Sequence, residues 1–216
     1  MVENVDCYTV GLLLKARHKL CCNNGIENCV ILITKFYSNE CVERVLADQP
    51  SAIHCRGPEG ETLLMYAKDI NVLNTLFKYK PDVNVSDDNR ENVLFHFIHQ
   101  RNHKFKIFAW DCMFFEMIRC VLRHGLDVNA TDGQDKSAIE YLLTKDSDQY
   151  FQLINILLAA GAIIPPRDST GRTPVMQLAS KAYHEEYFNI IERLLNQGAD
   201  PKARDDAASF GMEQGT

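Results

Sequence analysis

The chain has 216 residues, of which 46% are hydrophobic and 24% are charged, and these values are ordinary for a soluble globular protein. Its net charge of −6 argues against general binding to nucleic acids or to anionic membranes. No apolar stretch approaches the roughly 18–20 residues that a membrane-spanning helix needs, and the acidic start is unlike a secretory signal. The sequence therefore predicts an intracellular protein, cytoplasmic or nuclear, that does not bind membranes.

Two N-terminal segments come first in chain order. Apolar residues at helical spacing predict a capping helix and turn over residues 1–25. Residues 26–56 are expected to form a degenerate repeat unit, with helices over 30–36 and 41–46 and an extended stretch over 50–56. Six of the eight cysteines lie in this first quarter of the chain. Because they sit in apolar runs and no secretion signal precedes them, we expect reduced, buried thiols.

Four segments then repeat one pattern, and their predicted boundaries are 57–85, 86–130, 131–165 and 166–203. Each has a polar capping residue, an apolar helix, a turn, a second apolar helix and an extended polar finger. The capping positions are Thr62, Asn92, Ser137 and Thr173, and the glycines that end second helices are Gly125, Gly161 and Gly198. No unit can bury both helices alone, so neighbouring units must stack.

This pattern resembles the ankyrin repeat, whose signature is T-P-L-H followed by a G-A-D ending. Thr173-Pro174-Val175-Met176 with Gly198-Ala199-Asp200 is the best match, and Val93-Leu94-Phe95-His96 with Gly125-Leu126-Asp127-Val128-Asn129 is next. The resemblance covers about residues 57–203 and implies an all-α ankyrin-repeat solenoid of stacked helix-turn-helix units with extended β-turn fingers. It also implies that His96 occupies the family's structural histidine position.

The segment 204–216 is expected to be the truncated start of a further finger or a disordered tail. The last repeat has an apolar flank without an obvious polar cap, although stacks need such caps. Three explanations stay open: a truncated form, a fragment, or a flank that is buried against a partner.

The second unit is longer than the others, and the extra residues, roughly 99–111, belong between its two helices. Basic and aromatic residues alternate there, and the segment contains Phe108 and the single tryptophan, Trp110. We consider three roles for this insert: packing on its own unit, contact with a protein partner, or stacking on single-stranded RNA with Lys104 and Lys106 nearby.

Catalytic and metal-binding patterns are weak. His96, His99 and His103 lie at i, i+3 and i+7 near Cys112 and Cys120, but no Cys-x-x-Cys pair accompanies them. The chain has no Gly-x-Ser-x-Gly elbow, no phosphate-cradling glycine loop and no His-Glu-x-x-His. The sequence therefore predicts a protein that is not an enzyme and that needs no metal and no cofactor.

The family resemblance implies a non-catalytic scaffold or adaptor that binds a partner protein through its fingers and inner helices. The fingers are acidic, which predicts a basic partner, although aspartate and asparagine also form turns for purely structural reasons. Charge reversal at Asp87 and Asp88 is expected to weaken binding without lowering the melting temperature. The candidate partner-binding residues are Asp87, Asp88, Asn89, Asp132, Gln134 and Arg172 on the fingers, with Phe108 and Trp110 on the insert.

Three alternative functions remain at this point. The first is an IκB-like regulator that sequesters a transcription factor. The second is an adaptor that delivers clients to a ubiquitin ligase, although no box-type helix follows the repeats. The third is an RNA-associated protein that uses the basic–aromatic insert.

Overall fold

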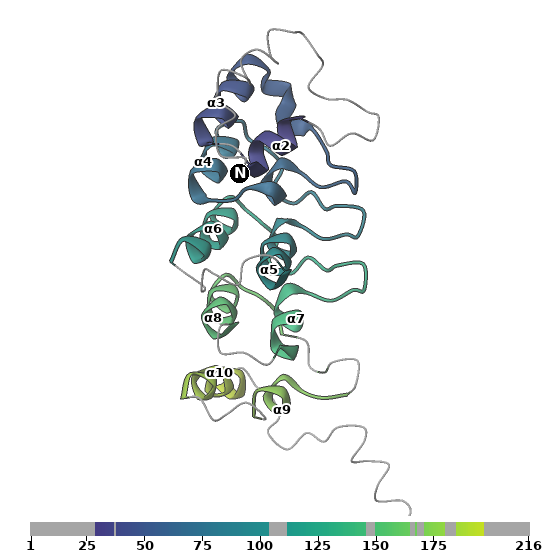
Figure 1. The fold of residues 1–216 in the computed structure, drawn as a ribbon. Helices are drawn as coiled ribbons and strands as arrows, with labels where there is room; N and C mark the ends of the chain where they lie inside the picture. Colours follow the sequence, from purple (N-terminus) through teal and green to yellow (C-terminus); the bar gives the residue numbers. More distant parts are fainter. Residues whose placement is uncertain are drawn as a thin grey trace, which may run out of the picture. The chain divides into compact units, whose positions relative to one another are not determined.

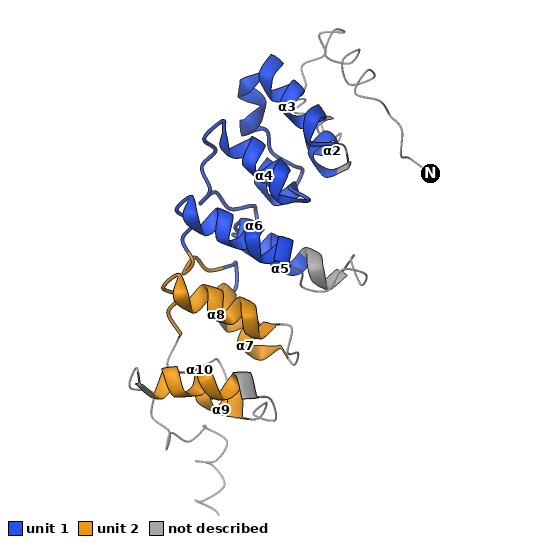
Figure 2. Cartoon of the chain, turned by 90° about the vertical axis from the view of Figure 1, so that its left-hand side faces the viewer, with its two compact units in different colours: residues 1–127, 132–134 blue, residues 128–131, 135–216 orange. Residues whose placement is uncertain are grey.

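The structure, a computed structural model, describes residues 29–36, 38–103, 112–145, 150–164, 167, 171–179 and 185–196. The chain divides into two compact units, the first made of residues 1–127 and 132–134 and the second of residues 128–131 and 135–216 (Figure 2). Within the described ranges the regular elements are helices, and the only β features are isolated bridges such as the one between Thr131 and Ser137. The all-α fold is confirmed. The predicted repeat boundaries stay predictions, and segments 1–25 and 204–216 lie outside the described residues.

The first unit consists of helices in two rows (Figure 1). The inner row contains α2, the 3-10 helix η2 and α5, and the outer row contains α3, α4 and α6; neighbours within each row pack against one another. Apolar side chains at helical spacing, such as Leu73, Leu76 and Ile118, are fully buried between the rows. The elements are α2 (Cys29–Phe36), α3 (Asn39–Asp48), η1 (Pro50–His54), η2 (Leu63–Tyr66), α4 (Ile70–Phe77), α5 (Val93–His103) and α6 (Cys112–Arg123).

The second unit contains two helix pairs. These are α7 (Ala138–Thr144) with α8 (Phe151–Ala159), and α9 (Pro174–Ala179) with α10 (Glu185–Asn196). Helix α7 packs on α8 and α9, and α10 packs on α8 and α9, so each pair covers the apolar face of the other. Leu142, Leu153 and Ile190 are buried where the helices meet.

The predicted helix starts are confirmed at all four capping positions, and Thr62 is the N-cap residue of η2. The Asn92 Oδ1 accepts a hydrogen bond from Leu94 N at 2.9 Å, and the Thr173 Oγ1 accepts one from Met176 N at 3.2 Å. Ser137 and Glu140 form a reciprocal capping box, in which Ser137 N donates to Glu140 Oε2 at 2.8 Å. These bonds satisfy backbone N–H groups that have no partner within the helix.

Two second helices end as predicted, at glycines in the left-handed conformation. Gly125 has φ 88° and Gly161 has φ 89°, which a residue without a Cβ adopts at little cost. In the 57–85 unit the same position holds Lys80, with φ 51°. Gly198 lies outside the described residues.

Two elements of the N-terminal half differ from the prediction, the first in length and helix type and the second in conformation. The first helix of the 57–85 unit is the four-residue 3-10 helix η2, because Asp69 already caps α4 by accepting from Val72 N at 2.9 Å. That cap leaves no room for a longer first helix. Residues 50–56 were expected to be extended, yet Pro50–His54 form the 3-10 helix η1, with Ala52 and Ile53 buried.

The insert and the cysteines also differ in part from expectation. Helix α5 continues to His103, so residues 99–103 lengthen the helix, while the remainder of the insert lies outside the described residues. Cys41 and Cys55 are buried and disulfide-bonded, so the prediction of reduced thiols is wrong for these two. Cys112 and Cys120 are free thiols, the first exposed and the second buried. The other four cysteine side chains lie outside the described part of the chain.

Candidate functional site

The loops that precede η2 and α5 in the first unit share one backbone frame. Gly57 N donates to Glu61 O at 2.8 Å, and Asp87 N donates to Glu91 O at 3.0 Å at the equivalent position of the next unit. Each frame contains one residue at positive φ, Gly60 at 79° in the first loop and Arg90 at 62° in the second. The two loops thus turn in the same way although their sequences differ.

Consecutive loop tips are joined by backbone hydrogen bonds. Asp88 N donates to Glu59 O at 2.9 Å, and Gly133 N donates to Asn89 O at 2.8 Å. The second contact is close, because a Cβ added at Gly133 would lie 2.9 Å from the Asn89 carbonyl oxygen. We call the side chains along these joined tips the tip row, and its members are Glu59, Asp88, Asn89, Asp132 and Gln134.

Most of the predicted finger residues are accessible. Asp88, Asn89 and Gln134 are exposed, Asp132 is half-buried, and Arg172 is exposed in the second unit. The hydrogen bonds bring the first four together within the first unit. Phe108 and Trp110 lie outside the described residues. Sequence reasoning missed Glu59 and the glycine at position 133, whose roles depend on contacts between loops that are distant in the sequence.

Asp87 differs from the other predicted finger residues because its side chain is only 2% exposed. Its Oδ1 accepts hydrogen bonds from Asn89 N and Glu91 N, both at 2.9 Å, so the carboxylate closes its own loop. A side chain buried in this way cannot offer its charge to a partner at the surface. We therefore remove Asp87 from the candidate partner-binding residues.

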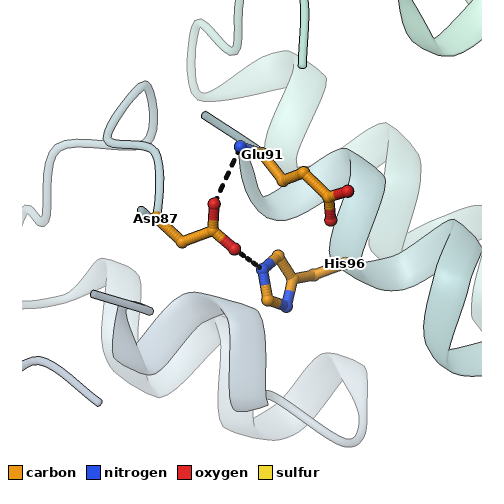
Figure 3. A group of neighbouring side chains, drawn as sticks. All are labelled: Asp87, Glu91 and His96. Atoms are coloured by element: carbon orange, nitrogen blue, oxygen red, sulfur yellow. Dashed lines mark hydrogen bonds and ion pairs between the residues drawn. The ribbon is translucent and has the colours of Figure 1, made fainter. Parts of the chain in front are cut away.

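The position expected for the structural histidine belongs to Phe95. Asn92 caps α5, and the fourth residue of the T-P-L-H stretch that begins at this cap is Phe95, which is buried at 1% exposure. His96 is the following residue and points to the loop, where its Nε2 lies 2.8 Å from Asp87 Oδ2 (Figure 3). The sequence prediction was wrong by one residue because Val93-Leu94-Phe95-His96 matches the signature only when it is shifted by one position.

Glu91 joins Asp87 and His96 in a carboxylate–histidine cluster. One donor atom from each of these three residues lies within 4.8 Å of the other two. Glu91 and His96 are 22% and 17% exposed, so the cluster opens to solvent on one side. Glu91 Oε2 also lies 3.1 Å from His99 Nδ1. The three residues come from one loop and the first turn of α5 (Figure 3).

Of the histidines and cysteines that the sequence places near one another, His96 and His99 lie at this cluster, whereas Cys120 has other neighbours. The Cys120 Sγ lies 3.8 Å from His124 Nδ1, and the His124 ring stacks on Phe77 with centroids 3.6 Å apart. Burial raises the pKa of the Cys120 thiol above its usual value, the Glu116 carboxylate adds to this rise, and the Arg123 guanidinium opposes it. A buried thiol with a raised pKa is a poor nucleophile.

None of the helices in the described part of the chain is both long and apolar enough to cross a lipid bilayer.

Paired helices packed in rows, with finger loops joined tip to tip, define the class of helical-repeat proteins. Residues 170–206 match the family model described as Ankyrin repeat. No curated protein matches the chain by sequence. Among solved structures, an ankyrin repeat domain from Acinetobacter baumannii AYE is similar with a TM-score of 0.61 and 20% identity, over 83% of this chain and 85% of that one. Residues 170–206 therefore contain an ankyrin repeat, and the fold over most of the chain is similar to that of an ankyrin repeat domain.

Proposed function

We propose that the protein is a non-catalytic interaction module that binds a partner protein through the tip row. Ankyrin repeats are generally protein-interaction modules, and the proposal names the surface that this chain uses. The observation that supports it most is the pair of backbone hydrogen bonds that joins Glu59 to Asp88 and Asn89 to Gly133. These bonds hold side chains from three successive loops in one fixed row, and preorganised side chains lose little entropy on binding.

The charge of the tip row favours a basic partner. Glu59, Asp88 and Asp132 supply three carboxylates, and Arg90 is the basic residue of the central loop. The Arg56 guanidinium donates hydrogen bonds to the carbonyl oxygens of Gly60 and Ser86, so it binds the backbone of the neighbouring loops and not the tip-row carboxylates. An acidic row of this kind steers a positively charged protein and sets its orientation.

The structural explanation for the acidic residues applies to some of them. The Asp132 Oδ1 accepts from Gln134 N at 2.8 Å, and the Asp82 Oδ1 accepts from Asn84 N at 2.9 Å, as turn-forming aspartates do. Asp88 is exposed and contributes its backbone N–H to the contact with Glu59, which leaves the exposed carboxylate as the best probe of recognition. Arg172 remains a proposed partner contact on a finger of the second unit, and Phe108 and Trp110 remain proposed contacts on the insert.

The test is the affinity of partner proteins captured with the wild-type chain. We expect Asp88→Lys to weaken binding about tenfold or more, because it reverses the central charge of the tip row. The matched control is Glu192→Lys, which makes the same charge change at an exposed position on α10. Both variants should melt within about 2 °C of the wild type, since exposed substitutions change stability little. Equal binding by the two variants would contradict the proposal.

Among the described residues, no contact favours the transcription-factor regulator, the ubiquitin-ligase adaptor or the RNA-associated alternative over the general proposal. The RNA hypothesis depends on residues 104–111, and its test is a salt-dependent gel shift with Lys104→Ala and Lys106→Ala.

A further inference from the structure

We propose that Asp87, Glu91 and His96 form a binding site for a divalent transition-metal ion of the zinc class. Their donor atoms already lie within 4.8 Å of one another. Zinc binds imidazole nitrogen and carboxylate oxygen at about 2.0–2.2 Å, which places its ligand atoms about 3–4 Å apart. Small side-chain rotations therefore suffice to enclose an ion, with water or His99 completing the coordination.

The backbone fixes the orientation of Asp87 for this role. The Asp87 Oδ1 is held by the N–H groups of Asn89 and Glu91, and this leaves Oδ2 directed at His96 (Figure 3). Hydrogen bonds that orient a ligand in this way are typical of metal sites, where they fix the direction of the donor atoms. The 2.8 Å contact between Asp87 Oδ2 and His96 Nε2 is the contact that an ion would replace.

Charge and solvent access also favour a cation. Asp87 is a buried carboxylate, and Glu91 places a second carboxylate beside it, so a divalent ion would offset their mutual repulsion. The partial exposure of Glu91 and His96 provides an entry path and room for water. The imidazole favours zinc and similar transition metals over calcium and magnesium, which prefer an all-oxygen site.

Comparison with the preceding loop supports a chemical role beyond loop closure. In the preceding loop the equivalent residues are Gly57, Glu61 and Tyr66, and the same backbone hydrogen bond forms there without an aspartate or a histidine. Tyr66 donates its hydroxyl to Glu61 Oε1 at 2.7 Å in place of the histidine contact. Closing the loop therefore does not require this donor set.

The experiment is a calorimetric titration of the full-length chain with Zn²⁺. We expect the wild type to bind one equivalent of Zn²⁺. The variant Glu91→Gln should bind this ion at least tenfold more weakly, because the amide removes the charge of the carboxylate and keeps its size. The matched control is Glu61→Gln, the same change at the equivalent position of the preceding loop, which should leave Zn²⁺ binding unchanged. His96→Gln is the second variant and should reduce affinity to a similar extent.

Cysteine thiolates could also bind Zn²⁺, and the absorption spectrum of bound Co²⁺ distinguishes a thiolate site from the proposed carboxylate–histidine site. Thiolate-bound Co²⁺ absorbs intensely in the near ultraviolet, whereas Co²⁺ at an oxygen–nitrogen site gives only its weaker visible bands. We expect the visible component to be lost in Glu91→Gln and kept in Glu61→Gln. Wild-type affinity in both Glu91→Gln and His96→Gln, or Co²⁺ bound only by thiolates, would overturn the proposal. The inference does not depend on the proposed function, because the donor set is separate from the tip-row side chains.

Discussion

Segments 57–66 and 87–96 of the first unit begin with the same backbone frame and differ in their chemistry. Both frames contain the same backbone hydrogen bond, from Gly57 N to Glu61 O at 2.8 Å and from Asp87 N to Glu91 O at 3.0 Å, and both turn through a residue at positive φ. The first contains a glycine and a tyrosine where the second contains Asp87 and His96. The repeat fixes the backbone frame, while two side-chain positions decide whether a loop is only structural or also carries a cluster of ligand-type groups.

The largest expected effect comes from removing the residue that distinguishes the second loop. Asp87→Ala leaves Asn89 N, Glu91 N and His96 without their carboxylate acceptor, and hydrogen bonds to a charged group contribute about 1.5–3 kcal/mol. We expect the free energy of unfolding to fall by about 2–3 kcal/mol, measured by urea denaturation. Asp88→Ala is the control and should change it by less than about 0.5 kcal/mol.

A loss below about 0.5 kcal/mol in Asp87→Ala would mean that the second loop closes as the first does, without help from the carboxylate. The sequence predicts that charge reversal at Asp87 and Asp88 weakens binding without lowering the melting temperature. With Asp87 buried, we expect reversal at Asp87 to lower stability and reversal at Asp88 to weaken partner binding.

The next effect concerns the contacts between loops. Asp88 carries a side chain at its contact with the preceding loop, whereas a Cβ at Gly133 would approach the Asn89 carbonyl oxygen to 2.9 Å. Since the obstructing atom is backbone, Gly133→Ala should destabilise by about 1–2 kcal/mol and increase amide exchange at the tips. Stability equal to the wild type would show that the second contact is as loose as the first.

The smallest effect extends the comparison to the ends of the units. Lys80 and Gly125 occupy the same position after the second helix, at φ 51° and 88°. The left-handed conformation destabilises a lysine by about 1–2 kcal/mol, and a glycine loses about 0.5–1 kcal/mol of stability through chain entropy. Lys80→Gly should therefore stabilise by about 0.5–1 kcal/mol in a thermal melt.

The reverse change at the glycine is a clean control for this prediction. Among the described residues, no atom beyond those of Gly125 and its chain neighbours lies within 4 Å of a Cβ added there, so Gly125→Ala reports the backbone conformation. It should destabilise by about 1 kcal/mol. Destabilisation by Lys80→Gly would contradict the argument from φ and would point to a contact of the lysine side chain.

Local signals predicted much of the fold. Capping residues and terminal glycines act through hydrogen bonds and dihedral angles a few residues away, so Asn92, Ser137, Thr173 and Gly125 were assigned correctly. The repeated phrase then required stacking, because one helix pair cannot bury its own apolar surface.

The candidate site was less predictable because its properties depend on neighbouring loops. Asp87 and Asp88 are adjacent and chemically identical in the sequence, yet one is buried and the other exposed. Whether His96 or Phe95 takes the buried position depends on which residue caps α5. The replacement of a full helix by η2 similarly follows from the cap at Asp69, which lies only three residues after η2 ends.

Hydrogen exchange of the free chain and of its complex with a captured partner tests the central claim most directly. We expect binding to slow exchange at residues 58–60, 87–90 and 132–134, the segments that carry the tip row, and to leave α4 and α6 unchanged. Protection confined to the outer helices α4 and α6, with the tip segments exchanging as in the free chain, would contradict recognition through the tip row.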